Sequence, residues 1–457
     1  MTTTIESHSP QAPSDVVARV PDSSRDQVAT ATGTARAAAS DWARGPAHAR
    51  SAALHACAEA LAAATGELTD LVVREVGKPV GEAGAEIGRG VAILRYFAQL
   101  ALLPEGEVYP PADGVSLLHT RRRPHGVVGL ITPWNFPVAI PLWKAAPALA
   151  FGNTVLLKPA PQSSAVALRL AELFAGKLPD GVLTVLTGLA GTGEAIVDAT
   201  DAVSFTGSVA AGQAVARRAV ARGIPVQCEM GGQNAAIVLP DADQEAAATA
   251  IAAAAMGYAG QKCTATSRVI VVGDAASFAE RLAAAVEALP VGDPANASTV
   301  VGPVIESRPR EAIREAVRRA GAGGARVLTG GSQPDGDGWF QAPTVLADVP
   351  AGDDLRTEEY FGPVCVVLPA ESAEAAVRVA NEVRHGLVAG VYTRSLGAAL
   401  TWADRLDVGM VKVNAPTTGV DFHAPFGGEK ESSYGPREQG TAARDFYTRT
   451  VTVTLTP

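Results

Sequence analysis

The spacing of apolar residues is helical over the first hundred positions of the chain. Residues 22–26 (Asp-Ser-Ser-Arg-Asp) are expected to cap one helix, and residues 47–64 form a longer run rich in alanine and leucine. Helical spacing continues from Leu71 to Phe97. A proline-rich break at 104–111 ends this part of the chain. The pattern therefore predicts a bundle of helices before the first sheet.

Alternation replaces helical spacing after this break. Val115 to Arg123 alternates enough to predict an exposed strand that leaves the main body. The tail Thr448 to Thr456 alternates β-branched residues and cannot pack alone. We expect the tail to join a sheet, in its own subunit or in another.

From Gly126 onward, short apolar runs alternate with turns and helical stretches. The runs are 127–132, 154–158, 183–186, 202–205 and 225–228, and the helical stretches between them are 163–174, 193–199 and 209–221. This rhythm predicts a doubly wound parallel sheet, which binds ligands at the carboxyl ends of its strands. A second alternating set runs from Asn234 to about Met410 and predicts a second α/β domain.

Composition narrows the class of protein. A chain of 457 residues predicts two or three domains, and 47% hydrophobic against 19% charged residues predicts surface hidden in a homo-oligomer. The net charge of −9 and the pI near 5.4 argue against a nucleic acid or an anionic membrane as partner. No stretch approaches the roughly 20 apolar residues that a membrane span needs.

The cysteines and histidines are scattered. The four cysteines are Cys57, Cys228, Cys263 and Cys365, and their spacing fits reduced thiols in the cytoplasm better than disulfides. Residues 1–20 are polar and match neither a secretory signal nor a transit peptide. The seven histidines have no ligand spacing, so we expect no metal site.

One of these cysteines lies in a position suited to chemistry. Cys263 follows a helical run from Asp241 to Tyr258, whose Asp241 is the expected N-cap, and precedes a strand from Arg268 to Gly273. It therefore falls in a turn opened by glycine, where main-chain amides and Lys262 could lower the pKa of its thiol. The alternative interpretation is a buried, inert thiol.

Four predicted strand ends carry polar groups. Asn135 lies between two prolines and could donate to an oxyanion, whereas Lys158 suits a ribose hydroxyl or a phosphate. Thr206-Gly207-Ser208 leads into a helix and offers amides to a pyrophosphate, and Glu229 could act as a general base. Each has a structural alternative, such as a helix cap for Asn135 or an ion pair for Glu229. Together they belong to the edge of the sheet where ligands bind.

These residues fall in motifs that resemble, in order, those of the NAD(P)-dependent aldehyde dehydrogenase superfamily. The resemblance extends from about Pro21 to the end of the chain. The motifs are Pro133-Trp134-Asn135-Phe136-Pro137, Phe205-Thr206-Gly207-Ser208, Glu229-Met230-Gly231-Gly232, Gly260-Gln261-Lys262-Cys263, Glu359-Tyr360-Phe361-Gly362-Pro363 and Pro425-Phe426-Gly427-Gly428.

The resemblance implies an α/β subunit in three parts. A Rossmann-type cofactor domain would comprise residues 1–108 and 127–231, and an α/β catalytic domain residues 232–443. A small β oligomerisation element would comprise residues 109–126 and 444–457, in a homodimer or homotetramer.

The resemblance also implies a mechanism. Cys263 would attack the aldehyde to give a thiohemiacetal, with Asn135 and the Cys263 amide holding the oxyanion. Hydride transfer to the nicotinamide would leave a thioester, and Glu229 would activate the water that hydrolyses it. An intact Glu229 speaks against a coenzyme A-acylating relative.

The cofactor residues follow from the same resemblance. Lys158 would contact the adenosine ribose, Ser208 with Thr206 and Gly207 the pyrophosphate, and Glu359 the nicotinamide ribose. Phe361 would lie near the nicotinamide ring, and Trp134 would also bind the cofactor.

Two positions depart from the family pattern. Pro161 occupies the place of a glutamate that many NAD-preferring members carry, so both NAD and NADP are expected as cofactors. Residues 447–449 offer no second acid near the thiol, so a single base is expected.

The substrate is the least specified feature. Residues 413–423 and 432–440 are similar to those of α-ketoglutaric semialdehyde dehydrogenases, which implies a small aliphatic aldehyde. The expected tunnel residues are mostly apolar, and no arginine for a substrate carboxylate is evident among them. An aromatic or plain aliphatic aldehyde therefore stays open. These tunnel residues are Phe136, Ile140, Trp143, Thr264 and Val420.

Two functions of other classes compete with aldehyde oxidation. A catalytically silent binding protein of the same fold would have no reason to retain Cys263, Glu229 and Asn135 together. A cysteine hydrolase would need a histidine and an acid that support the thiol, and no histidine lies in a motif near Cys263.

Overall fold

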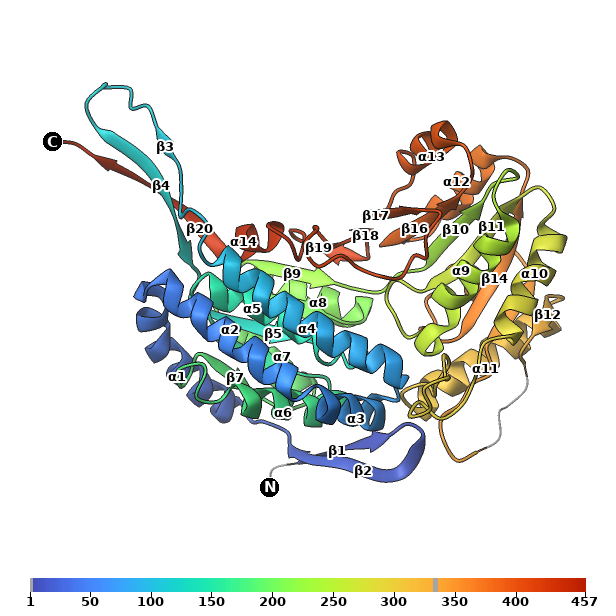
Figure 1. Cartoon of the computed structure of the whole chain (residues 1–457), viewed down its shortest axis with the longest axis horizontal. Coiled ribbons are helices and arrows are strands. Elements are labelled where there is room, and N and C mark those ends of the chain that lie inside the picture. The colour runs from blue at the N-terminus through green and yellow to red at the C-terminus, as the bar shows by residue number, and fades with distance from the viewer. Residues whose placement is uncertain (1–2, 332–335) are drawn as a thin grey trace.

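Two largely parallel sheets organise the chain in the computed structural model, which describes residues 3–331 and 336–457 (Figure 1). The first sheet has six strands in the order β19-β9-β8-β5-β6-β7, all parallel except β19. Its strands are β5 (Val127–Ile131), β6 (Thr154–Lys158), β7 (Leu183–Val185), β8 (Ala202–Thr206), β9 (Val226–Glu229) and β19 (Ser433–Tyr434). The predicted doubly wound parallel sheet is therefore confirmed.

Helices cover both faces of this sheet. Those between its strands are α5 (Ala139–Ala150), η1 (Pro161–Ser163) with α6 (Ser164–Phe174), α7 (Ala190–Ala199) and α8 (Val209–Ala221). The strand β5 reads Val-Val-Gly-Leu-Ile and is buried at every position, as expected for a strand covered on both sides.

The N-terminal helices pack around this sheet and include the predicted ones. They are α1 (Arg25–Arg44), α2 (Ala47–Ala63), α3 (Thr65–Val76) and α4 (Val80–Leu100). Ser24 and Gln27 form a capping box that begins α1. The helical run over 71–97 is interrupted because Gly77, in the left-handed conformation, ends α3 and Pro79 precedes α4. An antiparallel hairpin that the sequence analysis missed, β1 (Thr4–Ser9) with β2 (Ala12–Pro21), comes before them.

The second sheet has seven strands in the order β12-β13-β14-β11-β10-β16-β17, with only β12 antiparallel to its neighbour. The strands are β10 (Asn234–Val238), β11 (Thr266–Val272), β12 (Arg326–Thr329), β13 (Thr344–Ala347), β14 (Val364–Ala370), β16 (Val388–Tyr392) and β17 (Met410–Val413). The predicted second α/β unit is confirmed.

The helices of this second unit surround its sheet. They are α9 (Gln244–Met256), η2 (Gly257–Gly260), α10 (Ala275–Glu287), α11 (Ser307–Ala322), η3 (Asp354–Arg356), α12 (Ala373–Asn381) and α13 (Leu396–Ala403). Asp243 caps α9 through its side chain, whereas the expected cap, Asp241, accepts hydrogen bonds from Thr393 and Arg394.

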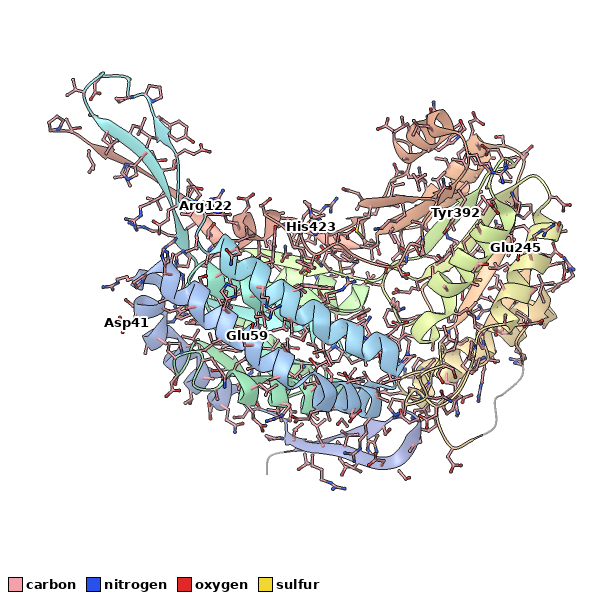
Figure 2. The ribbon with its side chains drawn as sticks, in the orientation of Figure 1. Asp41, Glu59, Arg122, Glu245, Tyr392 and His423 are labelled. Atoms are coloured by element: carbon pink, nitrogen blue, oxygen red, sulfur yellow. The ribbon has the colours of Figure 1, made fainter. Side chains whose placement is uncertain are left out.

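A three-stranded antiparallel sheet projects from the body as an arm (Figure 1). It comprises β3 (Val108–Tyr109), β4 (Leu117–Pro124) and β20 (Thr448–Leu455). The tail therefore pairs with β4 of its own chain, from Thr448 opposite Pro124 to Leu455 opposite Leu117. Arg122, labelled in Figure 2, lies near the root of the arm and contacts Asp445 at 2.6 Å.

Short elements of the C-terminal segment complete the fold. They are β15 (His385–Gly386), β18 (Glu429–Lys430) and α14 (Ala442–Tyr447). Because β19 pairs with β9, this segment passes from the second sheet back to the first. Within residues 3–331 and 336–457, no helix is long and apolar enough to cross a membrane, and no cluster of His, Cys, Asp or Glu could hold a metal ion.

Candidate active site

The loop before Cys263 has an unusual backbone. Tyr258, Ala259 and Gly260 are consecutive residues with φ of 54°, 51° and 66°, a left-handed conformation that costs roughly 1–2 kcal/mol for each residue with a side chain. Gly260 is required here because a Cβ atom would lie 2.3 Å from the main-chain oxygen of Gly362.

Side-chain hydrogen bonds hold this loop in place. Tyr258 is fully buried and donates from its hydroxyl to the oxygen of Val76 at 3.1 Å. Gln261 donates to Pro303 O at 3.1 Å and accepts from the amide of Ile305 at 2.8 Å. These hydrogen bonds fix the left-handed turn at Tyr258 and at Gln261. Cys263 follows the turn and lines a cavity.

The cavity has a volume of about 750 Å³ and lies at the carboxyl ends of β5, β6 and β8. Cys263 is half-buried at its wall. Burial raises the pKa of the Cys263 thiol to about 12, and the negative charges of Glu359 and Glu229 act in the same direction. Without a ligand, the thiol is therefore neutral at physiological pH.

The expectation that Lys262 lowers the pKa of this thiol is wrong. The Nζ atom of Lys262 contacts the carboxylate of Glu82 on α4 at 2.8 Å. The ammonium group is thus neutralised by Glu82, and it does not offset the acidic residues around Cys263.

Asn135 faces the cysteine loop. Its Nδ2 atom donates to the main-chain oxygen of Gln261 at 2.9 Å, and the side chain is buried. A carbonyl oxygen accepts only from the amide nitrogen, so this contact fixes which end of the side chain faces the loop. The helix-cap alternative fails, because Val138 is the N-cap of α5 and that helix end has no side-chain cap.

Glu229 ends β9 inside the protein, where its side chain is buried. Ser433 donates to its Oε2 atom. Burial raises the pKa of the Glu229 carboxyl well above its usual value, and the neighbouring charge of Glu438 raises it further. No Lys, Arg or His forms an ion pair with Glu229 in the described part of the chain, so the ion-pair alternative does not hold.

Glu438 is a second acid whose charge reaches Glu229 and Cys263, and the expectation of a single base stays a prediction. Glu438 is buried, pairs with Lys144, and accepts from Ser204 Oγ at 3.2 Å. This acid lies outside residues 447–449. Main-chain hydrogen bonds of 2.8 Å in both directions between Phe426 and Glu438 bring this acid to the site, and no pattern in the sequence signals this pairing.

The far part of the cavity contains the other predicted strand-end groups. Lys158 is buried and donates to the oxygens of Pro159 and Gly188 at 2.7 and 2.8 Å. Burial lowers the pKa of Lys158 to about 8. Ser208 is the N-cap of α8, and Gly207 precedes it at the cavity wall. Lys158, Thr206, Gly207 and Ser208 all line this cavity.

These residues suit a dinucleotide. The buried Oγ1 atoms of Thr132 and Thr206 have no hydrogen-bond partner, and both residues line the cavity. The 13-residue helix α8 directs its N-terminal amides toward the same space, which favours a phosphate group. Val197 and Val215 supply an apolar wall for a base. The volume also falls within the range of sites for cofactors.

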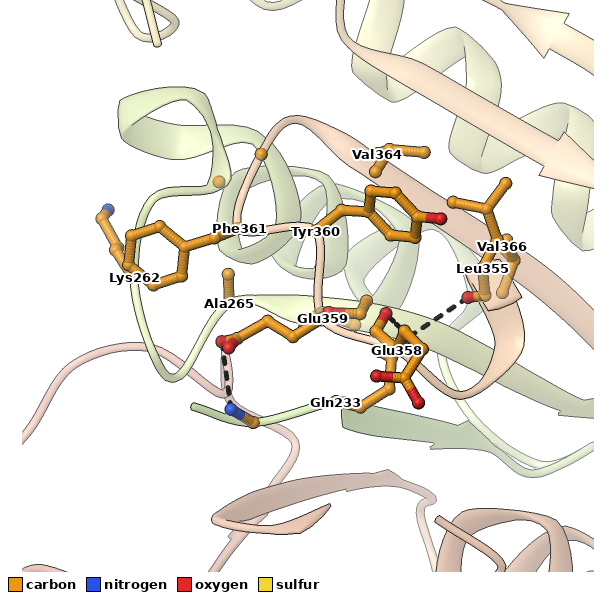
Figure 3. Close-up of a pocket in the computed structure, with 15 residues that line it drawn as sticks. Gln233, Lys262, Ala265, Leu355, Glu358, Glu359, Tyr360, Phe361, Val364 and Val366 are labelled. Carbon is orange, nitrogen blue, oxygen red and sulfur yellow. Dashed lines mark hydrogen bonds between the residues drawn. The ribbon is translucent and has the colours of Figure 1, made fainter. Parts of the chain in front are cut away.

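Glu359 and Phe361 line the cavity that Cys263 also lines, and Figure 3 shows both side chains beside a smaller neighbouring pocket. Glu359 accepts a hydrogen bond from the amide of Gly232 at 3.0 Å, and burial raises the pKa of its carboxyl to about 7. The Phe361 ring meets Trp134 edge to face, with ring centroids 5.8 Å apart. Both aromatic residues line the cavity.

The five expected tunnel residues do not all line this cavity. Of the five, Ile140 lines the cavity. The Phe136 ring packs under Lys78 Nζ at 3.7 Å, and Trp143 packs against Phe426 with ring centroids 5.8 Å apart. The carbonyl oxygens of Thr264 and Val420 accept hydrogen bonds from Thr417 and Arg89. The absence of an arginine for a substrate carboxylate among these five residues stays a prediction.

Comparison with known proteins gives one consistent result. The profile of the aldehyde dehydrogenase family matches residues 1–453. The chain is 39% identical to an α-ketoglutaric semialdehyde dehydrogenase of Bacillus subtilis (strain 168). This alignment extends over 463 residues and covers 99% of this chain and 95% of that protein. It is 37% identical to a benzaldehyde dehydrogenase [NAD(+)] of Pseudomonas putida, over 94% of this chain and 89% of the relative.

A solved structure agrees with these sequence matches. The crystal structure of an NAD-dependent aldehyde dehydrogenase from Sinorhizobium meliloti superposes with a TM-score of 0.95 at 35% identity. The match covers 99% of this chain and 92% of that one.

Proposed function

Because the chain belongs to the aldehyde dehydrogenase family, whose members oxidise aldehydes with NAD(P)+, we propose that Cys263, Asn135 and Glu229 carry out this oxidation here. The observation that carries the proposal is that Cys263 and Asn135 line one cavity suited to a dinucleotide, while the negative charge of the buried Glu229 acts on the Cys263 thiol. Aldehyde, water and NAD(P)+ would give carboxylic acid, reduced cofactor and a proton.

Cys263 is the proposed nucleophile. The thiol proton passes to water as the sulfur forms a bond to the aldehyde carbon, and the carbonyl oxygen becomes an oxyanion. The second N–H of Asn135 Nδ2 is left for this oxyanion, because the first is bound to Gln261 O. When bound, NAD(P)+ would supply a hydride acceptor and a positive charge near the Cys263 thiol. In the protein without cofactor, burial and the neighbouring carboxylates raise the pKa of this thiol. Oxidation of the adduct leaves a thioester on Cys263.

Glu229 is the proposed base for thioester hydrolysis. It takes a proton from water as the water oxygen attacks the thioester carbon, and the Cys263 thiolate leaves. The pKa of the Glu229 carboxyl is raised toward neutral pH. Near neutral pH, a carboxylate with a raised pKa is a more effective general base than a carboxylate with the ordinary pKa.

We propose that the cofactor is held by the residues of the far cavity. Lys158 would bind the adenosine ribose, Thr206, Gly207 and Ser208 the pyrophosphate, and Glu359 the nicotinamide ribose. Trp134 and Phe361 would border the ring. Pro161 lines the cavity in place of a carboxylate, which supports use of both NAD and NADP.

The proposed substrate is a small aliphatic semialdehyde such as α-ketoglutaric semialdehyde. The relative from Bacillus subtilis supports this choice, and an aromatic aldehyde is the second candidate because a benzaldehyde dehydrogenase is almost as similar.

The assembly and compartment belong to the same proposal. The arm exposes Val108, Val115 and Leu455, which supports an oligomerisation element in a homodimer or homotetramer, although no partner chain is described. The four cysteines are unpaired, which supports a reducing compartment such as the cytoplasm.

Absorbance at 340 nm tests this function. Purified protein is mixed with α-ketoglutaric semialdehyde, succinic semialdehyde, benzaldehyde or hexanal, each with NAD or NADP. We expect reduced cofactor with a semialdehyde. Silence with every pair, from protein whose Cys263 still reacts with a thiol probe, would contradict aldehyde oxidation.

A further inference from the structure

We propose that Asn234 is a positioning residue for the oxidation, because its side-chain amide holds the turn that carries Cys263 and keeps the Cys263 main-chain N–H available to the oxyanion. This inference rests on the proposed function and deepens it. It starts from two hydrogen bonds in which Asn234 Nδ2 donates to the main-chain oxygens of Cys263 and Ala265, each at 2.8 Å. Asn234 is the first residue of β10, and it is buried.

The turn around Cys263 is closed by one main-chain bond. The amide of Ala265 donates to Lys262 O at 2.9 Å, so these two residues, both labelled in Figure 3, are the ends of a four-residue turn. In a trans peptide the N–H points away from the C=O. Because the oxygen of Lys262 points into the turn, the N–H of Cys263 points out of it. The same amide acts to lower the pKa of the Cys263 thiol, which places it on the side of the sulfur.

Side chains hold the carbonyl oxygens that follow Lys262. Asn234 binds those of Cys263 and Ala265, and Thr417 Oγ1 donates to the one between them, Thr264 O, at 2.7 Å. The Oδ1 atom of Asn234 accepts from the amide of Val388 at 3.3 Å. Both N–H groups and the oxygen of this amide are therefore used, which fixes its orientation. The fork of Asn234 thus restrains the turn at two points.

Asn234 also belongs to the segment that carries the proposed base. Glu229 ends β9 and Asn234 begins β10, with four residues between them. Within this segment, a Cβ atom on Gly232 would lie 2.6 Å from Asn234 Oδ1 and 2.9 Å from Cys263 O. The cysteine turn therefore cannot move closer to this segment, and the fork of Asn234 opposes movement away from it. One residue thus sets the separation between the nucleophile and the segment of the base.

The test compares two buried asparagines that make the same kind of fork. Asn153 donates from Nδ2 to the oxygens of Ala148 and Tyr447 at 3.1 and 2.9 Å, but it does not line the cavity. Both Asn234→Ala and Asn153→Ala should lower the midpoint of thermal unfolding, because each leaves two carbonyl oxygens without their donor. Only the first should affect the reaction.

Kinetics below the unfolding temperature of each variant separate the two roles. We expect Asn234→Ala to lower kcat about 10- to 100-fold with the best aldehyde of the panel, since a misplacement of roughly 1 Å can cost that much. The KM for NAD(P)+ should stay as in the wild-type protein. Asn234→Ser keeps one donor and should recover part of kcat. Asn153→Ala should keep the kcat of the wild-type protein.

Alkylation of Cys263 gives a second readout that needs no aldehyde. Iodoacetamide reacts with the thiolate, and the other three cysteines are buried. Because the Cys263 amide favours the thiolate, Asn234→Ala should slow alkylation at pH 9 by about threefold or more. Asn153→Ala should leave the rate unchanged. Mass spectrometry of the peptide that contains Cys263 measures it.

Each other result has a distinct meaning. Wild-type kcat in Asn234→Ala would overturn the proposal, and so would an unchanged or faster alkylation, because Asn234 would then not act through Cys263. If Asn234→Ala does not fold, Asn234→Ser decides: wild-type kcat overturns the proposal, and a lower kcat with slower alkylation supports it. A wild-type protein that oxidises no aldehyde of the panel would overturn the proposed function, whereas slower alkylation of Asn234→Ala would still support the hold of Asn234 on the turn.

Discussion

Asn135 and Gln261 are joined by a 2.9 Å hydrogen bond from the Asn135 amide nitrogen to the Gln261 main-chain oxygen. This bond connects the turn after β5 with the loop that carries Cys263, two segments that are 126 residues apart. It orients the amide of Asn135 and holds it beside the nucleophile. The same side chain thus contributes to the position of the cysteine loop and to the proposed oxyanion site.

Replacement of Asn135 by Ala should lower kcat/KM for aldehyde oxidation about 100- to 1,000-fold, as expected for loss of one oxyanion donor. Steady-state kinetics with the best aldehyde of the panel measures the effect, and fluorescence of bound NADH reports whether the cofactor site is intact. Activity within threefold of the wild-type protein would show that Asn135 does not hold the oxyanion.

Replacement of Cys263 by Ala should abolish formation of reduced cofactor, because no other thiol among the described residues lines the cavity. NADH should still bind, since Lys158 and Ser208 are untouched. Cys228→Ala is a matched control, because that thiol is buried and donates to Gly212 O. Steady turnover by Cys263→Ala would exclude the cysteine mechanism.

Replacement of Glu438 by Gln should move the acidic limb of the kcat profile to lower pH. The negative charge of Glu438 raises the pKa of Glu229, and the base acts only when ionised, so removal of that charge lets Glu229 ionise at lower pH. A profile of kcat from pH 5 to 9 measures the shift. A limb that stays in place, or moves upward, would contradict the coupling of the two acids.

The sequence was sufficient for features that depend on neighbouring residues. Apolar strands such as Val127–Ile131 and the polar groups that end them were predictable, because a parallel sheet brings its carboxyl ends together. The hairpin of β1 and β2 was not, because the inward positions of β1 include Ser7 and Ser9 in place of apolar residues. Ser7 is buried through its hydrogen bond to Glu75, a contact across 68 residues.

The contacts at the site that the sequence did not predict have a similar origin. Lys262 lies next to Cys263 in the same loop, but the side chains of adjacent residues diverge. The ammonium group of Lys262 contacts Glu82 on α4, which is far away in the sequence. Glu438 meets Lys144 across 294 residues, and Arg89 meets Val420 across 331. No local pattern encodes such pairs, and only the folded chain brings them together.

Replacement of Gly260 by Ala should lower both stability and kcat. The left-handed backbone and the approach of Gly362 O leave no room for a Cβ atom, so the cysteine loop must shift. We expect a loss of at least about 1–2 kcal/mol in the free energy of unfolding, measured by denaturant titration. Gly33→Ala in α1 is the control, because nothing lies within 4 Å of its Cβ position and alanine favours a helix. Full activity of Gly260→Ala would contradict the role of the strained turn.

The central claim is that Cys263 forms a thioester that Glu229 hydrolyses, and Glu229→Gln tests it most directly. Rapid mixing of this variant with aldehyde and NAD(P)+ should give a burst of about one reduced cofactor per subunit, followed by little turnover. Mass spectrometry of the stopped reaction should then find the acyl group on the peptide that contains Cys263. Steady turnover without a burst, or an acyl group on another residue, would contradict the account.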